Sequence, residues 1–508
     1  MKKTLLFAFF SGLLFVNSGY SQNGRLWKEV KDNNFEMKTS ASRESFPSSY
    51  TTKSLDLISF RNQLLNSPER NSGDFSTVVI ELPNTSGGID RFRMYEASNF
   101  DSDLQAQFPE IRSYVGEGVD DKTAILRLSL DPKGIQAVVF RADKRSEFLE
   151  PISNDGSVYA IYESGRSKGK LPFTCSTQEQ NLVSDYSGKL SDAGRSSTGQ
   201  LLTFRLALSC TAEYSNYFGA TSSAQVSLVL AAFNATMTRV NGVFEKDFAI
   251  HMNIVSQSTN VIYYNASTDP YSDASTGATG AWNTELQNTL SSSLTGASTT
   301  LAANNAAYDV GHLFGATGGG GNAGCIGCVC VNDTSSTTDE NKGSGFTSPA
   351  DGIPEGDNFD IDYVAHEVGH QFGGPHTFNA VTGSCNGNRS AANAVEPGSG
   401  ITIMAYAGIC GSTNNLAPNS IPTFHTKSFQ SITAKVQSTT CQVTIPSNNF
   451  PPSVNAGGDY TIPKSTPFRL EGSASDIDNN PLTYSWEQND VGPASDWNAP
   501  TGNAAIFR

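Results

Sequence analysis

Residues 366–376 constrain this chain more than any other segment. They read His-Glu-Val-Gly-His-Gln-Phe-Gly-Gly-Pro-His and hold three of the six histidines of the chain. On a helix, His366 and His370 lie four positions apart on one face, where both rings can bind the same metal ion. Gly373 tolerates the left-handed backbone that ends a helix, so the chain can turn back and bring His376 to that ion. Three imidazoles leave the fourth tetrahedral position open to water, which is the arrangement of a catalytic zinc site.

Glu367 follows the first of these histidines within a predicted helix of residues 363–372. Its carboxylate would lie beside the metal without binding it, where it can accept a proton from water made acidic by the metal. The alternative is a structural zinc site, but such sites usually have four protein ligands, cysteines among them. Asp360 and Asp362 precede the helix, and we expect them to cap it or to interact with its dipole.

A methionine and a tyrosine follow in residues 401–406, which read Ile-Thr-Ile-Met-Ala-Tyr. Met404 alone would be an ordinary core residue, but with the histidine motif it suggests a turn beneath the metal. The phenol of Tyr406 could approach the metal or donate a hydrogen bond to a tetrahedral intermediate. A buried structural tyrosine is an equal alternative.

The histidine motif and the methionine turn together resemble the metzincin clan of zinc endopeptidases. Residues 201–441 are most similar to secreted bacterial reprolysin-like (adamalysin-related) metallopeptidases. The similar stretches are HEVGHQFGGPHTFN, SCNGN, EPGSGITIMAYAGICG, and YDVGHLF with its glycine-rich loop. Two features depart from animal adamalysins: Thr377 stands where they have aspartate, and the Met-x-Tyr pair is more like astacins, serralysins and pappalysins.

The resemblance implies a mixed α+β catalytic domain, with a twisted mixed sheet, long helices and an irregular C-terminal subdomain after Gly373. It also implies cleavage of protein or peptide substrates with one zinc ion as cofactor. The residues that it assigns are the zinc ligands His366, His370 and His376, the general base Glu367 and the Met-turn residue Met404. Two rivals are a binding or adhesion protein with an inactive protease domain and a zinc hydrolase of non-peptide amides. No ligand or base is lost, which argues against the first rival.

Composition and charge exclude other classes of protein. The 508 residues include 34 Lys and Arg against 49 Asp and Glu, a net charge of −15, so the basic face of a nucleic-acid binder is not expected. With 37% hydrophobic and 16% charged residues, the chain can bury a core and is not a charge-driven disordered protein.

The N-terminus has the pattern of a secretory signal peptide over residues 1–21. Lys2 and Lys3 precede an apolar run at residues 5–16 that is too short to span a bilayer. No later run reaches 18 apolar residues, so we expect no membrane span. The expected location is extracellular, where disulfides are stable.

Residues 22–198 are predicted to form a β-rich N-terminal domain that acts as a propeptide. Period-two or buried strand patterns occur at residues 77–82, 123–130, 135–140 and 158–162. The polar stretch 187–200, with Lys189 and Arg195, is predicted to be a cleavable linker.

Cys175 is the only cysteine of this domain. Its thiolate could fill the open position of a zinc site and so make the propeptide an intramolecular inhibitor. The alternative is a disulfide with Cys210. The number of cysteines does not decide between these alternatives. Without Cys175 seven cysteines remain, and an odd number leaves one of them unpaired.

The catalytic domain is predicted over residues 199–445. A strand at residues 203–209, a helical spacing from Val226 to Val240 and a strand at residues 248–255 form a βαβ unit, which favours a parallel or mixed sheet. A second helix is expected around residues 282–290 and a third strand at residues 308–314.

Three weaker signals lie in or near this domain. His312 precedes the glycine run 318–321, which we interpret as a flexible loop near a substrate edge strand, because no helix follows as a phosphate loop requires. His251 and His425 are expected to be structural.

The remaining cysteines suggest structural bridges. Cys385 and Cys410 bracket the segment from the third histidine to the Met-turn and are expected to pair, as are Cys330 and Cys441. The motif of residues 325–330, C-x-x-C-x-C, could hold a second metal or a redox pair, although structural bridges are favoured.

Residues 446–508 are expected to begin an immunoglobulin-like or PKD-like β module. This expectation rests on the Pro-Pro and Gly-Gly pairs and on the β-like run at residues 482–486. The module is shorter than the roughly 100 residues of such a sandwich, so we expect the chain to stop within it. Residues 475–480 (SDIDNN) could bind calcium, although a polar turn is the commoner explanation.

Overall fold

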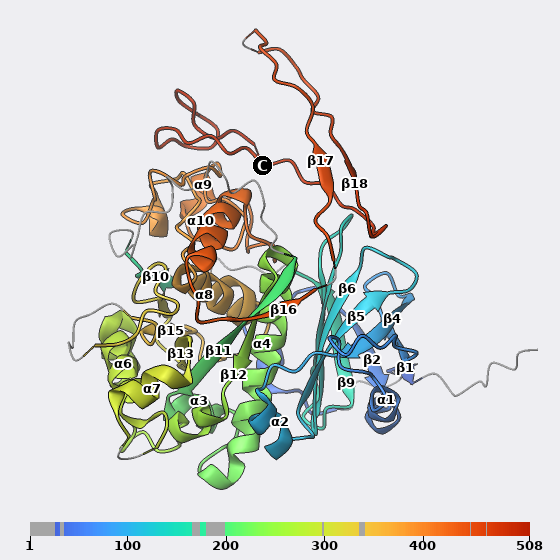
Figure 1. The fold of residues 1–508 in the computed structure, drawn as a ribbon, viewed down its shortest axis with the longest axis vertical. Coiled ribbons are helices and arrows are strands. Elements are labelled where there is room, and N and C mark those ends of the chain that lie inside the picture. The colour runs from blue at the N-terminus through green and yellow to red at the C-terminus, as the bar shows by residue number, and fades with distance from the viewer. Residues whose placement is uncertain are drawn as a thin grey trace, which may run out of the picture.

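The computed structural model describes residues 26–30, 35–164, 173–178, 199–296, 299–334, 341–447, 449–463 and 465–507. Two sheets lie on either side of one long helix, α4 (Val226–Phe248), and the C-terminal strands project away from them (Figure 1). The predicted signal peptide and most of the predicted linker lie outside the described residues, so both stay predictions. No helix in the described ranges has the length and apolarity needed to cross a bilayer.

The N-terminal half is a nine-stranded sheet in which every neighbouring pair is antiparallel. Its strands run in the order β1-β2-β9-β8-β7-β6-β5-β4-β3. Their bounds are β1 (Trp27–Glu29), β2 (Thr51–Leu55), β3 (Val79–Pro83), β4 (Ile89–Glu96), β5 (Arg112–Gly118), β6 (Ile125–Asp131), β7 (Gly134–Phe140), β8 (Glu147–Pro151) and β9 (Val158–Glu163). The helices α1 (Leu57–Leu64) and α2 (Ser102–Gln107) lie between strands along the chain. All four strand patterns found in this half of the sequence coincide with β3, β6, β7 and β9.

The second sheet is mixed, as the βαβ pattern predicts. Its order is β10-β14-β15-β13-β11-β12, and β16 pairs antiparallel with β11. The bounds are β10 (Thr174–Cys175), β11 (Gln200–Cys210), β12 (Ile250–Ile254), β13 (Val310–Phe314), β14 (Gly320–Asn322), β15 (Gly345–Ser348) and β16 (Val443–Pro446). Strand β11 is parallel to β12 and β13, whereas β14 is antiparallel to β15.

The helices of this half pack against the second sheet and around the site described below. Their bounds are α3 (Ala212–Tyr217), α5 (Ala274–Thr276), α6 (Trp282–Ser293), α7 (Leu301–Ala307), α8 (Ala365–Gln371), α9 (Gly411–Asn414) and α10 (Thr426–Gln437). Between α8 and α10 regular structure is sparse, which agrees with the expected irregular subdomain.

The core of the molecule joins the two halves. Side chains of β7, β8 and β9, such as Phe140 and Phe148, belong to the same buried cluster as Phe233, Met237 and Val240 of α4. Helix α4 packs against β5, β6 and β7 of the first sheet and against β12 of the second. The helix buries residues on most of its circumference, polar ones such as Asn234 and Asn241 included, as its position between two sheets requires.

Three disulfides lie in the half of the chain that forms the second sheet. Cys385 pairs with Cys410 and Cys330 with Cys441, as expected, and Cys325 pairs with Cys328. The alternative of a second metal site at the C-x-x-C-x-C motif is therefore wrong. Cys175 and Cys210 are both free and buried, which excludes a disulfide between them.

The C-terminal region shows less β structure than its sequence suggests. Strands β17 (Ser453–Asn455) and β18 (Ser473–Ser475) form a two-stranded antiparallel ribbon. Residues 482–486 form no strand, so the strand expected there is wrong, and the immunoglobulin-like module stays a prediction. Asp476 accepts hydrogen bonds from the backbone of Asp478 and Asn480, which is a polar turn.

Candidate active site

Helix α8 carries the histidine motif and follows a π-helical turn (Asn358–Val364). The helical segment in the structure therefore begins earlier than the helix predicted for residues 363–372. At its end Gly373 has φ of 100°, the left-handed conformation predicted for this position. A Cβ atom at Gly373 would lie 2.9 Å from Cβ of Lys435, so the turn also leaves no room for a side chain. The turn brings His376 back to the helix.

The three histidine rings and one thiol converge. One ligand atom from each of Cys175, His366, His370 and His376 lies within 4.8 Å of the others, and all four residues are buried. The Nε2 atoms of His370 and His376 are 3.1 Å apart, and Sγ of Cys175 is 3.6 Å from Nε2 of His370.

The two separations measured from Nε2 of His370, 3.1 Å and 3.6 Å, are close to those around one tetrahedral zinc ion. Bond lengths of about 2.1 Å to nitrogen and 2.3 Å to sulfur place two nitrogens about 3.4 Å apart and a nitrogen and a sulfur about 3.6 Å apart. The donor set is also chemically suitable, because imidazole and thiolate are the ligands that zinc prefers. The four residues present therefore fit the metal that the sequence predicts.

Backbone carbonyls orient two of the rings. Nδ1 of His366 donates to the carbonyl oxygen of Ile403 at 2.6 Å, and Nδ1 of His370 donates to that of Gly374, also at 2.6 Å. Each bond fixes the tautomer that leaves Nε2 free for a metal. Burial and the neighbouring rings lower the pKa of His370 well below its usual range, so this ring is neutral, the form that binds metal.

Glu367 lies beside the cluster and is fully buried. Burial raises the pKa of its carboxyl to about 8, and Oε2 accepts a hydrogen bond from Oγ1 of Thr177 at 3.1 Å. A Cβ atom at Gly321 in β14 would clash with Oε1 of Glu367. The glycine run thus lets the edge strand approach the carboxylate, a role that the sequence did not reveal.

Met404 packs directly under α8. A Cβ atom at Gly369, between the two helical histidines, would lie 2.5 Å from Sδ of Met404. The carbonyl of Met404 accepts a hydrogen bond from the backbone N–H of Thr377 at 3.1 Å. The methionine therefore contacts both the helix and the segment that carries His376, and its role as a Met-turn stays a prediction.

Tyr406 lies at the cluster and not in a remote part of the core. Its ring centroid is 4.7 Å from that of His376 and 5.6 Å from that of His366. Its hydroxyl donates to the carbonyl oxygen of Cys175 at 3.2 Å. The phenol is within reach of a group bound at the cluster.

The segment around Cys175 occupies the edge of the second sheet. Strand β10 pairs in parallel with β14, and the backbone N–H of Ser176 donates to Gly321 at 2.9 Å. Phe173 stacks on Tyr363, with ring centroids 3.8 Å apart. Through Cys175 and Thr177, this segment contacts His370, Glu367 and Tyr406.

Glu396 is a buried carboxylate that no sequence motif marks. Its side chain accepts hydrogen bonds from Oγ1 of Thr377 at 2.6 Å and from Oγ1 of Thr402 at 2.5 Å. These bonds tie the residue after the third histidine to the turn before Met404. No local pattern marks Glu396, although Thr377, where the chain departs from adamalysins, is its partner.

Two aspartates do not cap the helix. Asp360 is buried and pairs with Arg239 of α4 at 2.8 Å, and Asp362 accepts a hydrogen bond from the backbone of Ser420 at 2.7 Å. The expectation of a cap is wrong, because both lie inside the π-helical turn and are bound by distant parts of the chain. Asp360 does lie in the first turn of that helical segment, the position expected for an interaction with the dipole.

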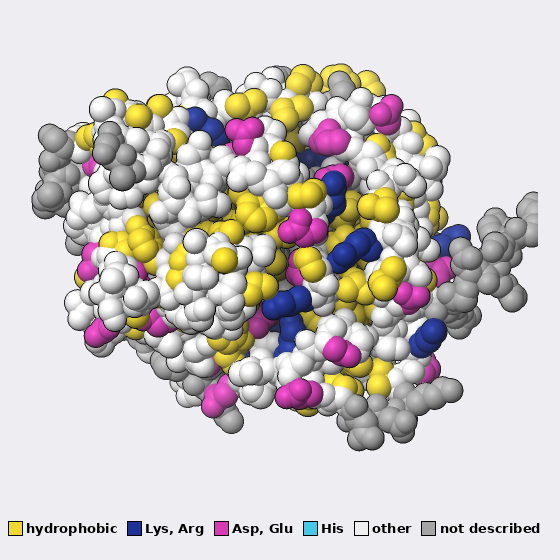
Figure 2. Space-filling model, turned by 90° about the horizontal axis from the view of Figure 1, so that it is seen from below, with side chains coloured by type: hydrophobic (Ala, Val, Ile, Leu, Met, Phe, Trp, Pro, Cys, Tyr) yellow, Lys and Arg dark blue, Asp and Glu magenta, His cyan; other side chains and the backbone are white. Residues whose placement is uncertain are grey.

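The other histidines are structural in position. Nδ1 of His312 donates to Oε1 of Gln371 at 2.8 Å, and Oγ1 of Thr347 is 2.8 Å from Nε2. Burial lowers the pKa of His312 to about 4. His312 thus anchors the end of α8 to β13. All six histidine rings are buried, and none appears on the face in Figure 2.

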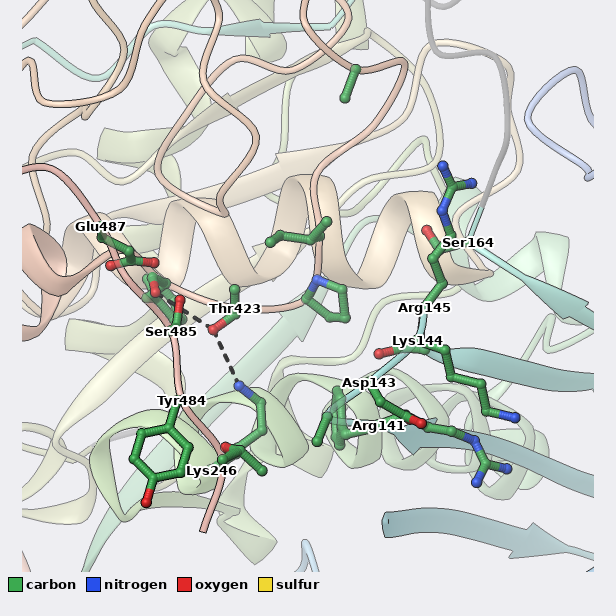
Figure 3. A pocket seen from close by; sticks show the side chains of 18 of the residues that line it. Arg141, Asp143, Lys144, Arg145, Ser164, Lys246, Thr423, Tyr484, Ser485 and Glu487 are labelled. Atoms are coloured by element: carbon green, nitrogen blue, oxygen red, sulfur yellow. Dashed lines mark hydrogen bonds between the residues drawn. The ribbon is translucent and has the colours of Figure 1, made fainter. Parts of the chain in front are cut away.

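A pocket of about 720 Å³ lies apart from the histidines. Residues 141–145, in the loop between β7 and β8, lie on one side of it, and Tyr484, Ser485 and Glu487 lie on the other (Figure 3). Lys246 points toward Thr423 and donates a hydrogen bond to it. It contains no residue of the predicted site, and we assign it no chemistry.

Residues 201–435 match the family described as metallo-peptidase family M12B, reprolysin-like. The match spans strands β11 to β15, the histidine motif and the turn that carries Met404, and it ends within α10. A comparison with curated proteins gives no match.

Proposed function

We propose, from the premise that residues 201–435 belong to the reprolysin-like M12B metallopeptidases, that this chain is a secreted zinc endopeptidase held latent by its own N-terminal region. The family is one of zinc-dependent peptidases, so hydrolysis of peptide bonds is the activity. The individual residue roles, the latency and the secretion are the parts that we propose.

One observation carries the residue assignment: four buried ligand atoms converge at separations that suit tetrahedral zinc. His366, His370 and His376 would hold the ion in the active enzyme, and Cys175 would take the fourth position only in the latent chain. When bound, zinc polarises a peptide carbonyl and makes water more acidic.

Glu367 acts as the general base. Its carboxylate accepts a proton from the attacking water and passes it to the leaving nitrogen. A buried carboxylate whose pKa is raised to about 8 holds a proton more readily than an exposed one, which suits a group that must both take and return it. Tyr406 donates a hydrogen bond to the oxygen on which negative charge develops.

Latency follows from the contacts of the segment 173–178. Cys175 would fill the position where water must bind, Thr177 binds the carboxylate of Glu367, and the carbonyl of Cys175 binds the hydroxyl of Tyr406. The segment also pairs with the edge strand β14, which an extended substrate could otherwise use. Cleavage in residues 179–198 would allow it to leave.

Substitution of the base tests the proposal. The Glu367→Ala variant of the processed enzyme should retain one zinc ion per chain but lose cleavage of denatured casein. The matched control is Glu213→Ala on α3, an exposed carboxylate that should leave the rate unchanged. A chelator should abolish the activity of the wild-type enzyme. Casein cleavage by Glu367→Ala at the wild-type rate would show that the assigned base is wrong.

A further inference from the structure

We propose that the nine-stranded N-terminal sheet stays bound to the catalytic half after activation, as a permanent part of the active enzyme. Only the segment that carries Cys175 would leave the site. This inference rests on the proposed function, since it concerns how the latent chain becomes active. It adds to the prediction that residues 22–198 act as a propeptide, because it states what becomes of this domain after the linker is cut.

Helix α4 is enclosed by both sheets. A Cβ atom at Gly242 would lie 2.7 Å from Cγ of Arg127 and 2.9 Å from Cε2 of Phe140, so the helix backbone approaches β6 and β7 closely. Phe140 and Phe148 share one buried cluster with Phe233 of α4. Loss of the first sheet would expose this apolar face of the helix, which is costly in water.

Polar residues along α4 form hydrogen bonds with Asn99, which lies in the connection between β4 and α2 of the N-terminal half. Nδ2 of Asn99 donates to Oδ1 of Asn234 at 3.0 Å and to Oγ1 of Thr238 at 2.8 Å, and Nδ2 of Asn241 donates to Oδ1 of Asn99 at 3.0 Å. All four side chains are buried. Buried amides need such partners, so this face of α4 suits a permanent neighbour better than one that departs.

A buried carboxylate of α4 is also paired with charged residues of the N-terminal half. Glu245 of α4 forms ion pairs with Arg127 and Arg70, both from the N-terminal half, and it also contacts His251 at 2.6 Å. Without the first sheet Glu245 would keep only the histidine. Breaking buried ion pairs by removing one side is strongly unfavourable.

The first sheet also supports the helix that carries the metal ligands. The hydroxyl of Tyr162 donates to Oδ1 of Asp357 at 3.3 Å, and Arg43 lies 3.8 Å from the same carboxylate. Arg239, the partner of Asp360, also lies 3.8 Å from Glu150 of β8. Both aspartates belong to the turn that leads into α8, so the sheet and the metal site share one buried network.

The contacts of the Cys175 segment are far fewer. Strand β10 has two residues, and among the strands of the described ranges it pairs with the short strand β14 alone. A single cut in residues 179–198 would free its C-terminal side. The strand could then separate from β14 while the nine strands of the first sheet keep their contacts with α4.

The test begins with the full chain, cut by trypsin and separated by size-exclusion chromatography at low and high salt. Mass spectrometry and N-terminal sequencing should find the sheet fragment and the catalytic fragment in equal amounts in the active peak. An active peak that contains only the catalytic fragment would overturn the inference. Zinc content and chelator inhibition of the same peak test the proposed function separately. An inactive peak that still holds both fragments would argue against the proposed function but not against retention of the sheet.

The Asn99→Ala variant tests the interface directly, and Asn84→Ala, in a turn of the same sheet that contacts Asp90, is its matched control. We expect the cut Asn99→Ala complex to dissociate several-fold faster than wild type and to lose activity in step. Full activity of the dissociated catalytic fragment would contradict the inference. Should Asn99→Ala fail to fold, hydrogen exchange of the cut wild-type enzyme decides: protection of β6, β7 and α4 supports retention, and its loss refutes it.

Discussion

The thiol of Cys175 lies 3.6 Å from Nε2 of His370, although 195 residues separate them along the chain. The same residue accepts a hydrogen bond from Tyr406 through its carbonyl. One short segment of the N-terminal region therefore contacts a proposed metal ligand and a proposed oxyanion donor at once.

The first prediction concerns this thiol. Cys175→Ser removes the fourth ligand, because a neutral hydroxyl binds zinc far more weakly than a thiolate. We expect the uncut variant to cleave a fluorogenic peptide roughly tenfold faster than the uncut wild type. The rate should stay below that of the processed enzyme, because Thr177 still binds Glu367.

The other free thiol provides the control for that prediction. Cys210 is buried next to Ser215 and outside the histidine cluster, so Cys210→Ser should leave the uncut chain as latent as wild type. Equal latency of the Cys175→Ser and wild-type chains would show that the thiol does not block the site.

The sequence predicts the metal cluster because its geometry is local. His366, His370, Gly373 and His376 lie within one helix and one turn, where spacing alone determines which side chains meet. The strand patterns of the first sheet are equally local, since alternating burial is visible within each strand.

Contacts between distant segments are not visible in this way. Asp360 looks like a helix cap until Arg239, 121 residues earlier, is seen to pair with it. Gly321 looks like part of a flexible loop until the carboxylate of Glu367 is seen against it. Tertiary packing decides the role of both residues, and no pattern in their neighbourhood records it.

The second prediction concerns Tyr406. Removing its hydroxyl with Tyr406→Phe in the processed enzyme should lower kcat by roughly tenfold to a hundredfold, because a hydrogen-bond donor to the developing oxyanion is lost. KM and zinc content should change little. A purely structural tyrosine would instead give an unchanged kcat together with a lower Tm, which thermal unfolding of the same sample detects.

The third prediction is a pH dependence of stability. Burial holds the pKa of His312 at about 4, whereas an unfolded chain has about 6.5. Between these values the unfolded chain binds more protons than the folded one, so stability falls as pH falls from about 6.5 to 4. The full shift corresponds to about 3 kcal/mol as an upper limit.

Urea unfolding of the uncut chain at pH 7 and pH 4.5 measures this dependence. His312→Gln can keep a hydrogen bond to Gln371 but does not titrate. We expect the variant to be less stable at pH 7 and to lose less stability on acidification. The same loss in both proteins would mean that His312 does not contribute to the acid sensitivity.

The fourth prediction concerns the packing of Met404 against α8. Gly369→Ala places a methyl group 2.5 Å from Sδ of Met404, so the methionine or the helix must move. We expect a loss of about 1–3 kcal/mol in stability and weaker zinc retention during dialysis against a chelator, because His366 and His370 flank the site. Gly458→Ala, where a Cβ atom meets nothing within 4 Å, should change neither.

A second substitution separates crowding from other effects of Gly369→Ala. Met404→Ala alone should destabilise the chain by leaving a cavity, roughly 2–5 kcal/mol for a buried methionine. If the two side chains compete for the same space, the double variant should be more stable and retain zinc better than the sum of the single effects predicts. Strict additivity in unfolding and zinc retention would show that Met404 does not support the helix through Gly369.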